Sequence, residues 1–394
     1  MGVRRLGAVV LASLLLATGC SEGGTAPPGT PAARGSAAPQ APPSIRVSAS
    51  HCGEGWTHPH TGDQTLMVAN DGDVSAGADL IDVPGGAVHA ELEGLAPGTT
   101  RTVHVSLGPG TYAIRCEIDG RDPIAGPPVT VSGGGSGGPA TLPVTYNDLY
   151  APAQAYRDYV AGGLKTLVAR TRTLAGAVDA GDLAAARAAW LPAHLAYESL
   201  GAAYDTFGDF DGEIDGRPAG LPGGVRDPGF TGMHRVEYGL WHGESAKSLR
   251  PAADRLYKDV RALRADFPDE QLEPGDLPLR AHEILENTLR FELSGRADEG
   301  SGTTLATAAA NLRGTRATVG VLRPLLRTRY PGLAGLDRRL DRVEALLKAQ
   351  RHGGRWTPVE DLDPPVRESI DGAVGDLLEG LAPIATICFP RRTQ

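Results

Sequence analysis

The chain has 394 residues, of which 41% are hydrophobic, a composition typical of a soluble globular protein with two or three domains. Its 47 acidic residues outnumber its 38 basic residues, so the formal net charge at pH 7 is −9. This balance, without any concentrated basic patch, argues against a nucleic-acid partner.

The first twenty residues are predicted to be an export signal. Arg4 and Arg5 precede the apolar run 6–17, which is too short to span a bilayer as a mature helix. The sequence ATGC then ends at Cys20 and is typical of a bacterial lipobox, which predicts a lipid on the sulfur of Cys20. An ordinary secretory signal is the alternative. In both cases the protein is exported, to the outer face of the cell membrane or the periplasm.

Residues 21–43 are rich in Gly, Pro, Ala and Ser and predict a disordered tether. From 44 to 132, short strand-like stretches alternate with turn signals such as NDGD and PGG, which predicts a small β-sandwich. The Gly/Ser-rich segment 133–141 is a linker. The predicted strands are 45–50, 64–71, 100–107, 110–116 and 128–133.

Residues 142–390 have long amphipathic patterns, which predict an up-and-down helical bundle of about six to eight helices. Asp182 and Asp361 are suitable residues for the start of a helix. Acidic, turn-rich segments connect the patterns. The clearest helical patterns are 167–178, 182–204, 278–293, 336–350 and 366–381.

The stretch GFTGMHRVEYGLW, residues 229–241, carries the candidate metal site. His234 and Glu237 are three residues apart, so on a helix they share a face and can offer an imidazole nitrogen and a carboxylate to one cation. This spacing also arises by chance. The alternative is a core histidine packed near Tyr238 and Trp241, with Glu237 as an ion-paired acid.

A metal site needs further donors from other helices, and the sequence offers several acids. His194 lies four residues before Glu198 and shares its helix face, where it would either orient a ligand or pack between helices. The acidic candidates are Glu198, Asp205, Asp209, Asp211, Glu213, Asp215, Glu283 and Glu286.

Three stretches together resemble the EfeO family of exported iron-uptake components. They are WLPAHLAYESLGAAYDTFGDFDGEID (190–215), the G-x-H-x-x-E motif in GFTGMHRVEYGLW, and AHEILENTLRFELSG (281–295). The resemblance spans about residues 145–390 and implies an imelysin-like helical domain, which is also grouped with metallopeptidases. The segment before it resembles the cupredoxin-like domain of full-length EfeO proteins.

The resemblance implies that the helical domain binds iron, as Fe³⁺ or Fe²⁺, through His234 and Glu237. Glu198 would be a third ligand, Asp215 a fourth, and Glu286 a weaker fifth. Carboxylate oxygens and imidazole nitrogens suit this metal. The protein would be the extracytoplasmic iron-binding component of an EfeUOB-type uptake system. It would deliver iron to a membrane permease and would have a haem-dependent, dye-decolourising-type peroxidase as a companion.

Two other functions stay open, a zinc metallopeptidase of imelysin type and a surface adhesion module with a structural metal. A zincin helix requires H-E-x-x-H, but Arg235 and Val236 follow His234, and the next histidine is His242. A G-x-S-x-G nucleophile motif is absent from the sequence. The sequence therefore favours a binding protein over an enzyme.

The N-terminal domain contains Cys52 and Cys116. A blue-copper site needs Cys, His and Met ligands, yet EIDGRDPIAGPP after Cys116 contains neither His nor Met. Two cysteines in an exported domain can form a disulfide. The alternative is a secondary copper or iron site made by Cys52, Glu54 and Cys116 with a nearby histidine. The domain would then oxidise Fe²⁺ or pass metal between the domains.

Overall fold

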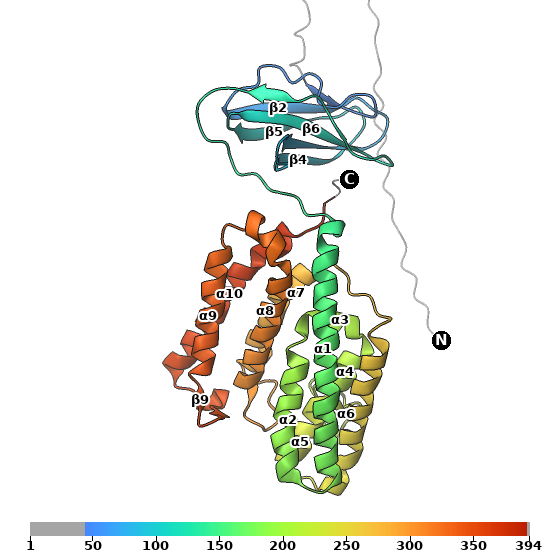
Figure 1. Ribbon diagram of the computed structural model, residues 1–394, viewed down its shortest axis with the longest axis vertical. Coiled ribbons are helices and arrows are strands. Elements are labelled where there is room, and N and C mark those ends of the chain that lie inside the picture. Colours follow the sequence, from blue (N-terminus) through green and yellow to red (C-terminus); the bar gives the residue numbers. More distant parts are fainter. Residues whose placement is uncertain (1–43, 392–394) are drawn as a thin grey trace, which may run out of the picture. The chain divides into compact units, whose positions relative to one another are not determined.

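The computed structural model describes residues 44–391. The predicted export signal, with Cys20, and the tether 21–43 lie outside the described residues. Within 44–391, eight strands come first and ten α-helices follow, with a small hairpin, β9 (Arg351–His352) and β10 (Arg355–Trp356), between the last two helices (Figure 1). In this part of the chain, every helix is too short or too polar to cross a membrane.

The N-terminal domain consists of two β-sheets. The first has the order β1-β2-β5, in which β1 is parallel and β5 antiparallel to β2. The second has the order β4-β3-β6-β7, is antiparallel, and also pairs β8 with β6. The strands are β1 (Ile45–Val47), β2 (Gly62–Asn70), β3 (Ala76–Asp82), β4 (Val88–Leu95), β5 (Thr100–Leu107), β6 (Gly110–Ile118), β7 (Ile124–Ala125) and β8 (Val129–Val131).

Both sheets contribute to one hydrophobic core, because alternate residues of strands such as β2, β5 and β6 face inward. Leu66 and Val68 of β2 and Leu80 of β3 are examples, each at most 7% exposed. The sequence patterns did not predict β3 and β4. Gly and Asp in β3 and the glutamates in β4 have low strand propensity, and pairing with β6 outweighs that preference.

Cys52 and Cys116 form a disulfide inside this core, where both residues are buried. The disulfide uses both sulfur atoms, and Glu54 lies exposed on the surface. Of the two alternatives left open by the sequence, the structure therefore contains the disulfide and not a thiolate metal site.

The C-terminal domain is helical, as predicted. The 34-residue helix α1 lies along α2 and α6, and α8 packs against α1, α2, α7 and α9 (Figure 1). Three short helices connect α2 to α6: α3 (Tyr204–Phe207), α4 (Asp209–Asp215) and α5 (Gly232–Trp241). The longer helices are α1 (Tyr146–Asp179), α2 (Leu183–Glu198), α6 (Ala246–Asp266), α7 (Leu277–Asn287), α8 (Thr304–Arg329), α9 (Leu333–Lys348) and α10 (Pro364–Ile387).

Local signals explain several helix ends. Asp182 is the N-cap of α2, as predicted, and its side chain accepts from the amide of Ala185 at 2.9 Å. The predicted start at Asp361 is wrong. Asp361 ends a short 3₁₀ turn, and α10 begins after Asp363 because proline at residue 364 suits the first helical position.

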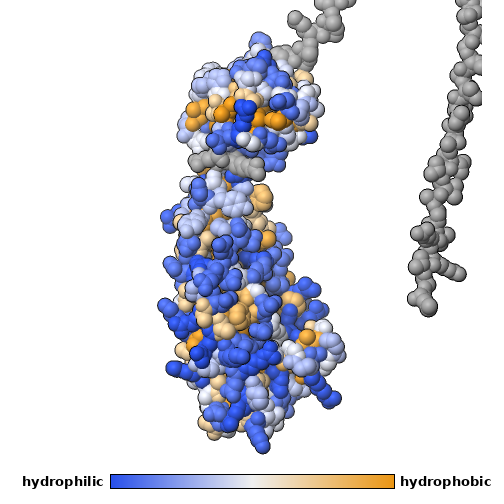
Figure 2. All heavy atoms as spheres, turned by 90° about the vertical axis from the view of Figure 1, so that its right-hand side faces the viewer, coloured by the Kyte–Doolittle hydropathy of each residue, from blue (hydrophilic) through white to orange (hydrophobic). Residues whose placement is uncertain are grey.

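The helical domain has a polar surface and a mainly apolar interior. Figure 2 shows a largely hydrophilic face with small hydrophobic areas among charged residues. Inside, Tyr156, Trp190 and Tyr197 are less than 2% exposed. Charged side chains in this interior are exceptional, because burying an ionised group is costly unless it is paired or binds a metal. The acidic residues and histidines of this domain with at most 9% exposure are His194, Glu198, His234, Glu237, Asp259 and Glu292.

Candidate metal centre

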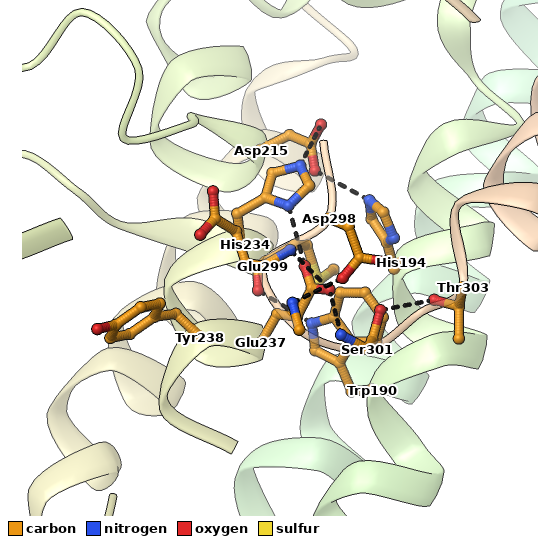
Figure 3. Close-up of polar contacts among 12 residues, drawn as sticks. Trp190, His194, Asp215, His234, Glu237, Tyr238, Asp298, Glu299, Ser301 and Thr303 are labelled. Atoms are coloured by element: carbon orange, nitrogen blue, oxygen red, sulfur yellow. Dashed lines mark hydrogen bonds and ion pairs between the residues drawn. The ribbon is translucent and has the colours of Figure 1, made fainter. Parts of the chain in front are cut away.

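Two histidines and an aspartate from three helices meet inside the helical domain. His194 lies on α2, Asp215 is the last residue of α4, and His234 is in the first turn of α5. One ligand atom from each residue lies within 4.8 Å of the other two. Figure 3 shows the three side chains pointing toward one another. The arrangement can hold one cation between two imidazole nitrogens and a carboxylate oxygen.

The start of α5 is fixed against the end of α4. Gly232, the first residue of α5, has φ +81°, and a Cβ atom there would lie 2.2 Å from the carbonyl oxygen of Ile214. Thr231 Oγ1 also donates to the carbonyl of Glu213 at 3.0 Å. This close approach brings Asp215 Oδ2 to 3.9 Å from His234 Nε2.

His194 joins the cluster from α2, one helical turn before Glu198. Its Nε2 lies 3.1 Å from Glu198 Oε1 and 3.4 Å from Asp215 Oδ1. The alignment is not that of a hydrogen bond, so both ring nitrogens of His194 and Asp215 Oδ1 are buried without a hydrogen-bond partner among the described residues. Buried polar atoms are normally paired, and a cation at this point would account for His194 Nε2 and Asp215 Oδ1.

Glu237 lies on the far side of His234 from Asp215. Its Oε2 is 3.1 Å from His234 Nδ1, which fixes the ring with Nε2 toward the cluster. Its Oε1 accepts from the amides of Glu299 and Ser301, at 3.2 and 3.1 Å (Figure 3). Both carboxylate oxygens of Glu237 are thus engaged by protein groups.

Glu292 is a further carboxylate at the site, and the sequence analysis missed it. It ends a π-helical turn, Thr288–Glu292, that continues α7, and such turns are frequent at functional sites. The side chain is buried, and its Oε2 has no hydrogen-bond partner among the described residues. Burial and the nearby charge of Glu198 raise the pKa of Glu292 to about 8.

The electrostatics of the cluster favour positive charge. Burial by itself would lower the pKa values of His194 and His234, but the surrounding carboxylates outweigh burial and raise both above the usual 6.5. Burial would raise the pKa of Asp215, yet the charge of His234 and contact with His194 lower it below 3.8. The carboxylates thus attract protons or another cation to this point.

Asp215 and His234 of the cluster line a cavity of about 260 Å³, whereas His194 is not part of its lining. Besides Glu198, Asp215, His234 and Glu292, the lining contains Asn311 from α8. With its amide nitrogen turned toward Glu198, the buried Asn311 donates to Glu198 Oε2 at 2.8 Å. The remaining lining includes Tyr204, Asp205, Asp211, Arg217, Arg280, Glu283, Asn287 and Phe291.

The structure therefore brings together three of the predicted ligands, Glu198, Asp215 and His234, and places Glu237 behind His234. It does not bring Glu286 to the cluster. Glu286 is on an outer face of α7, with its side chain 56% exposed and its Oε2 3.7 Å from His282 Nδ1. For His194, whose role the sequence left open, the four-residue spacing to Glu198 was the available signal. For Glu292 the sequence contained no comparable signal.

The family model for imelysin, Peptidase_M75, matches residues 152–384, a range that contains the whole cluster. An iron uptake system component EfeO from Yersinia pestis is 31% identical over 293 residues, which are 74% of this chain and 77% of that protein. The EfeO of Escherichia coli O157:H7 is 29% identical over 297 residues, with the same shares covered.

Proposed function

This chain belongs to the imelysin family and is an EfeO-type iron uptake component, and we propose that His194, Asp215 and His234 form the site that holds the iron. Glu198 and Glu292 supply further oxygen ligands from the same cavity. The observation that carries the proposal is the convergence of ligand atoms from three helices within 4.8 Å of one another, of which His194 Nε2 and Asp215 Oδ1 are buried without a hydrogen-bond partner among the described residues.

The donor types suit this cargo. Two imidazoles and one carboxylate are the set that holds Fe²⁺ in many non-haem iron proteins, where other coordination positions remain open. Additional carboxylates favour Fe³⁺, because hard, highly charged ions prefer oxygen ligands. A carrier must also release its cargo, and positions open toward the cavity provide a route for ligand exchange.

Glu237 acts in this proposal through His234. A hydrogen bond from the second ring nitrogen to a carboxylate is the usual way in which a protein orients a metal-binding histidine. The two amides that bind Glu237 Oε1 fix that carboxylate in turn. The protein is a binding component in this proposal and not a peptidase. A zincin helix has the motif H-E-x-x-H, whereas here Arg235 follows His234 in place of the catalytic glutamate, and Tyr238 takes the place of the second histidine.

The remaining parts of the chain fit an exported carrier. A lipid on Cys20 anchors the protein outside the cytoplasm, and the two-sheet N-terminal domain is cupredoxin-like. Uptake requires transport across a membrane, so the carrier delivers iron to a membrane permease. A haem-dependent peroxidase as a companion is supported by the family resemblance alone.

Iron binding by the purified full-length chain tests the proposal. We expect wild-type protein to retain a single iron ion after anaerobic dialysis against Fe²⁺, and Asp215→Asn and His194→Ala to lower the affinity by about tenfold or more. Glu286→Gln, an exposed acid of the same domain, is the matched control and should bind as wild type. Unchanged binding in both cluster variants would overturn the proposal.

A further inference from the structure

The cavity that Asp215 and His234 line also has a basic side. Arg217, two residues after Asp215, and Arg280 on α7 both line it. A pocket that bound only a cation would be weakened by guanidinium groups in its wall, because like charges repel strongly where water is scarce. The two arginines therefore need a partner of negative charge.

Arg280 has such partners in the protein, since it forms ion pairs with Asp205 and Glu283. Arg217 takes part in no ion pair or hydrogen bond found within residues 44–391. Its guanidinium carbon lies 3.5 Å from the centre of the Phe291 ring. Stacking on an aromatic face leaves the N–H groups at the edge of the guanidinium able to donate.

The nearby acid Asp211 also lines the cavity, and burial raises the pKa of its carboxyl group, although the charge of Arg217 acts to lower it. The two side chains form no ion pair found within residues 44–391, and Asp211 Oδ1 accepts from Tyr197 Oη at 2.5 Å. Asp215 lies next to the two histidines. Arg217 thus remains a cation in the wall of the iron cavity with its hydrogen-bonding capacity unused by the described residues.

The cavity also has more room than an ion needs. Its volume is about 260 Å³, whereas one water molecule occupies roughly 30 Å³ in the liquid. A hexacoordinate ion bound by the three cluster residues, even with one oxygen each from Glu198 and Glu292, keeps at least one position open toward this space. That position and Arg217 belong to the same cavity.

We propose that the site binds iron together with a small chelating oxyanion, either carbonate or a short carboxylate such as citrate. The anion places one or two oxygens on the iron and accepts hydrogen bonds from Arg217. A guanidinium binds such planar oxygen pairs in a bidentate manner, and the anion in turn shields the iron from the charge of Arg217. This inference rests on the proposed iron site and specifies the form in which the cargo is held.

Equilibrium dialysis of the full-length chain with Fe²⁺ under anaerobic conditions tests whether an oxyanion binds together with the iron. One arm contains isotopically labelled bicarbonate and the other contains labelled citrate. We expect wild-type protein to retain iron and one of these labelled anions in equal amounts, and metal-free protein to retain neither anion. The arm that gives retention identifies the source of the oxyanion.

Variants at Arg217 provide the second measurement. Arg217→Gln should lose the retained anion and bind iron about tenfold more weakly in the presence of that anion, the size expected from one charge-assisted interaction. In buffer free of both anions, wild-type protein should fall to the affinity of Arg217→Gln. Arg217→Lys keeps the charge but loses the planar fork, so it should be intermediate. Arg172→Gln, an exposed position on α1, should match wild type.

The outcomes separate this inference from the proposed function. Iron binding that is identical with and without either anion would overturn the oxyanion alone and leave the iron site standing. Anion retention that is as high in Arg217→Gln as in wild type would also overturn it. Failure of the wild-type protein to bind iron in any arm would overturn both.

Discussion

Glu237 Oε2 lies 3.1 Å from His234 Nδ1, so the imidazole of His234 is held from behind by a carboxylate that is itself fixed by two backbone amides. The sequence motif G-x-H-x-x-E therefore encodes a histidine and the group that orients it. The amides come from the loop before α8, more than sixty residues further along the chain.

Changing Glu237 to Gln tests this positioning role. A glutamine keeps the shape and one acceptor but loses the charge opposite His234, so we expect iron affinity to fall about tenfold to a hundredfold while binding remains saturable. Titration of wild-type and variant protein with Fe²⁺ measures both quantities. Loss of saturable binding, together with one oxygen ligand fewer in the X-ray absorption spectrum, would instead make Glu237 a direct ligand.

Gly232→Ala should damage both stability and iron binding. The substitution combines an unfavourable positive φ with a clash against the Ile214 carbonyl, so we expect a loss of about 1–3 kcal/mol in the free energy of unfolding. Relief of the clash separates α5 from α4 and moves His234 away from Asp215. Thermal unfolding and bound iron are the measurements. Gly212→Ala in α4, where an added Cβ meets no atom within 4 Å, should leave both unchanged.

Iron affinity should rise with pH. The pKa values of His194 and His234 are above 6.5, so near neutral pH their protons must be displaced by the metal. In metal-free protein the same shifts stabilise the fold below pH 6.5, and this contribution is lost as the pH rises through the folded-state pKa values. Glu292, with a pKa of about 8, adds a proton to be released if it binds iron.

Calorimetric titrations at pH 6, 7 and 8, in buffers of different ionisation enthalpy, measure both the affinity and the number of protons released. Each proton released makes the affinity rise by up to about tenfold per pH unit. If the affinity is independent of pH in this range, the metal displaces no protons from the histidines. That result would contradict their role as ligands.

Reduction of the Cys52–Cys116 disulfide should affect only the N-terminal domain. The bond joins residues 64 apart in the sequence, and removing such a link is expected to cost about 2–5 kcal/mol of unfolding free energy. The iron content of the protein should stay the same after mild reduction. Copper, zinc or iron gained on reduction, and absent in Cys52→Ser, would show that the thiolates form a second metal site.

Local patterns in the sequence determined several features of this protein. Alternation and turn residues gave the strand-rich N-terminal domain, and amphipathic spacing gave the helical one. The three-residue spacing of His234 and Glu237 required that they share a face of one helix, because this follows from helix geometry alone. The four-residue spacing of His194 and Glu198 required the same of α2.

Only the tertiary structure decided which acids join the histidines. Asp215 is selected from five acids in residues 205–215 because Gly232 lets α5 contact the end of α4. Glu292 is selected over Glu286 because the two point to different sides of the α7 segment, and packing decides which side faces the cavity. Helical periodicity relates residues within one helix, whereas the rotation of each helix about its axis depends on the partners against which it packs.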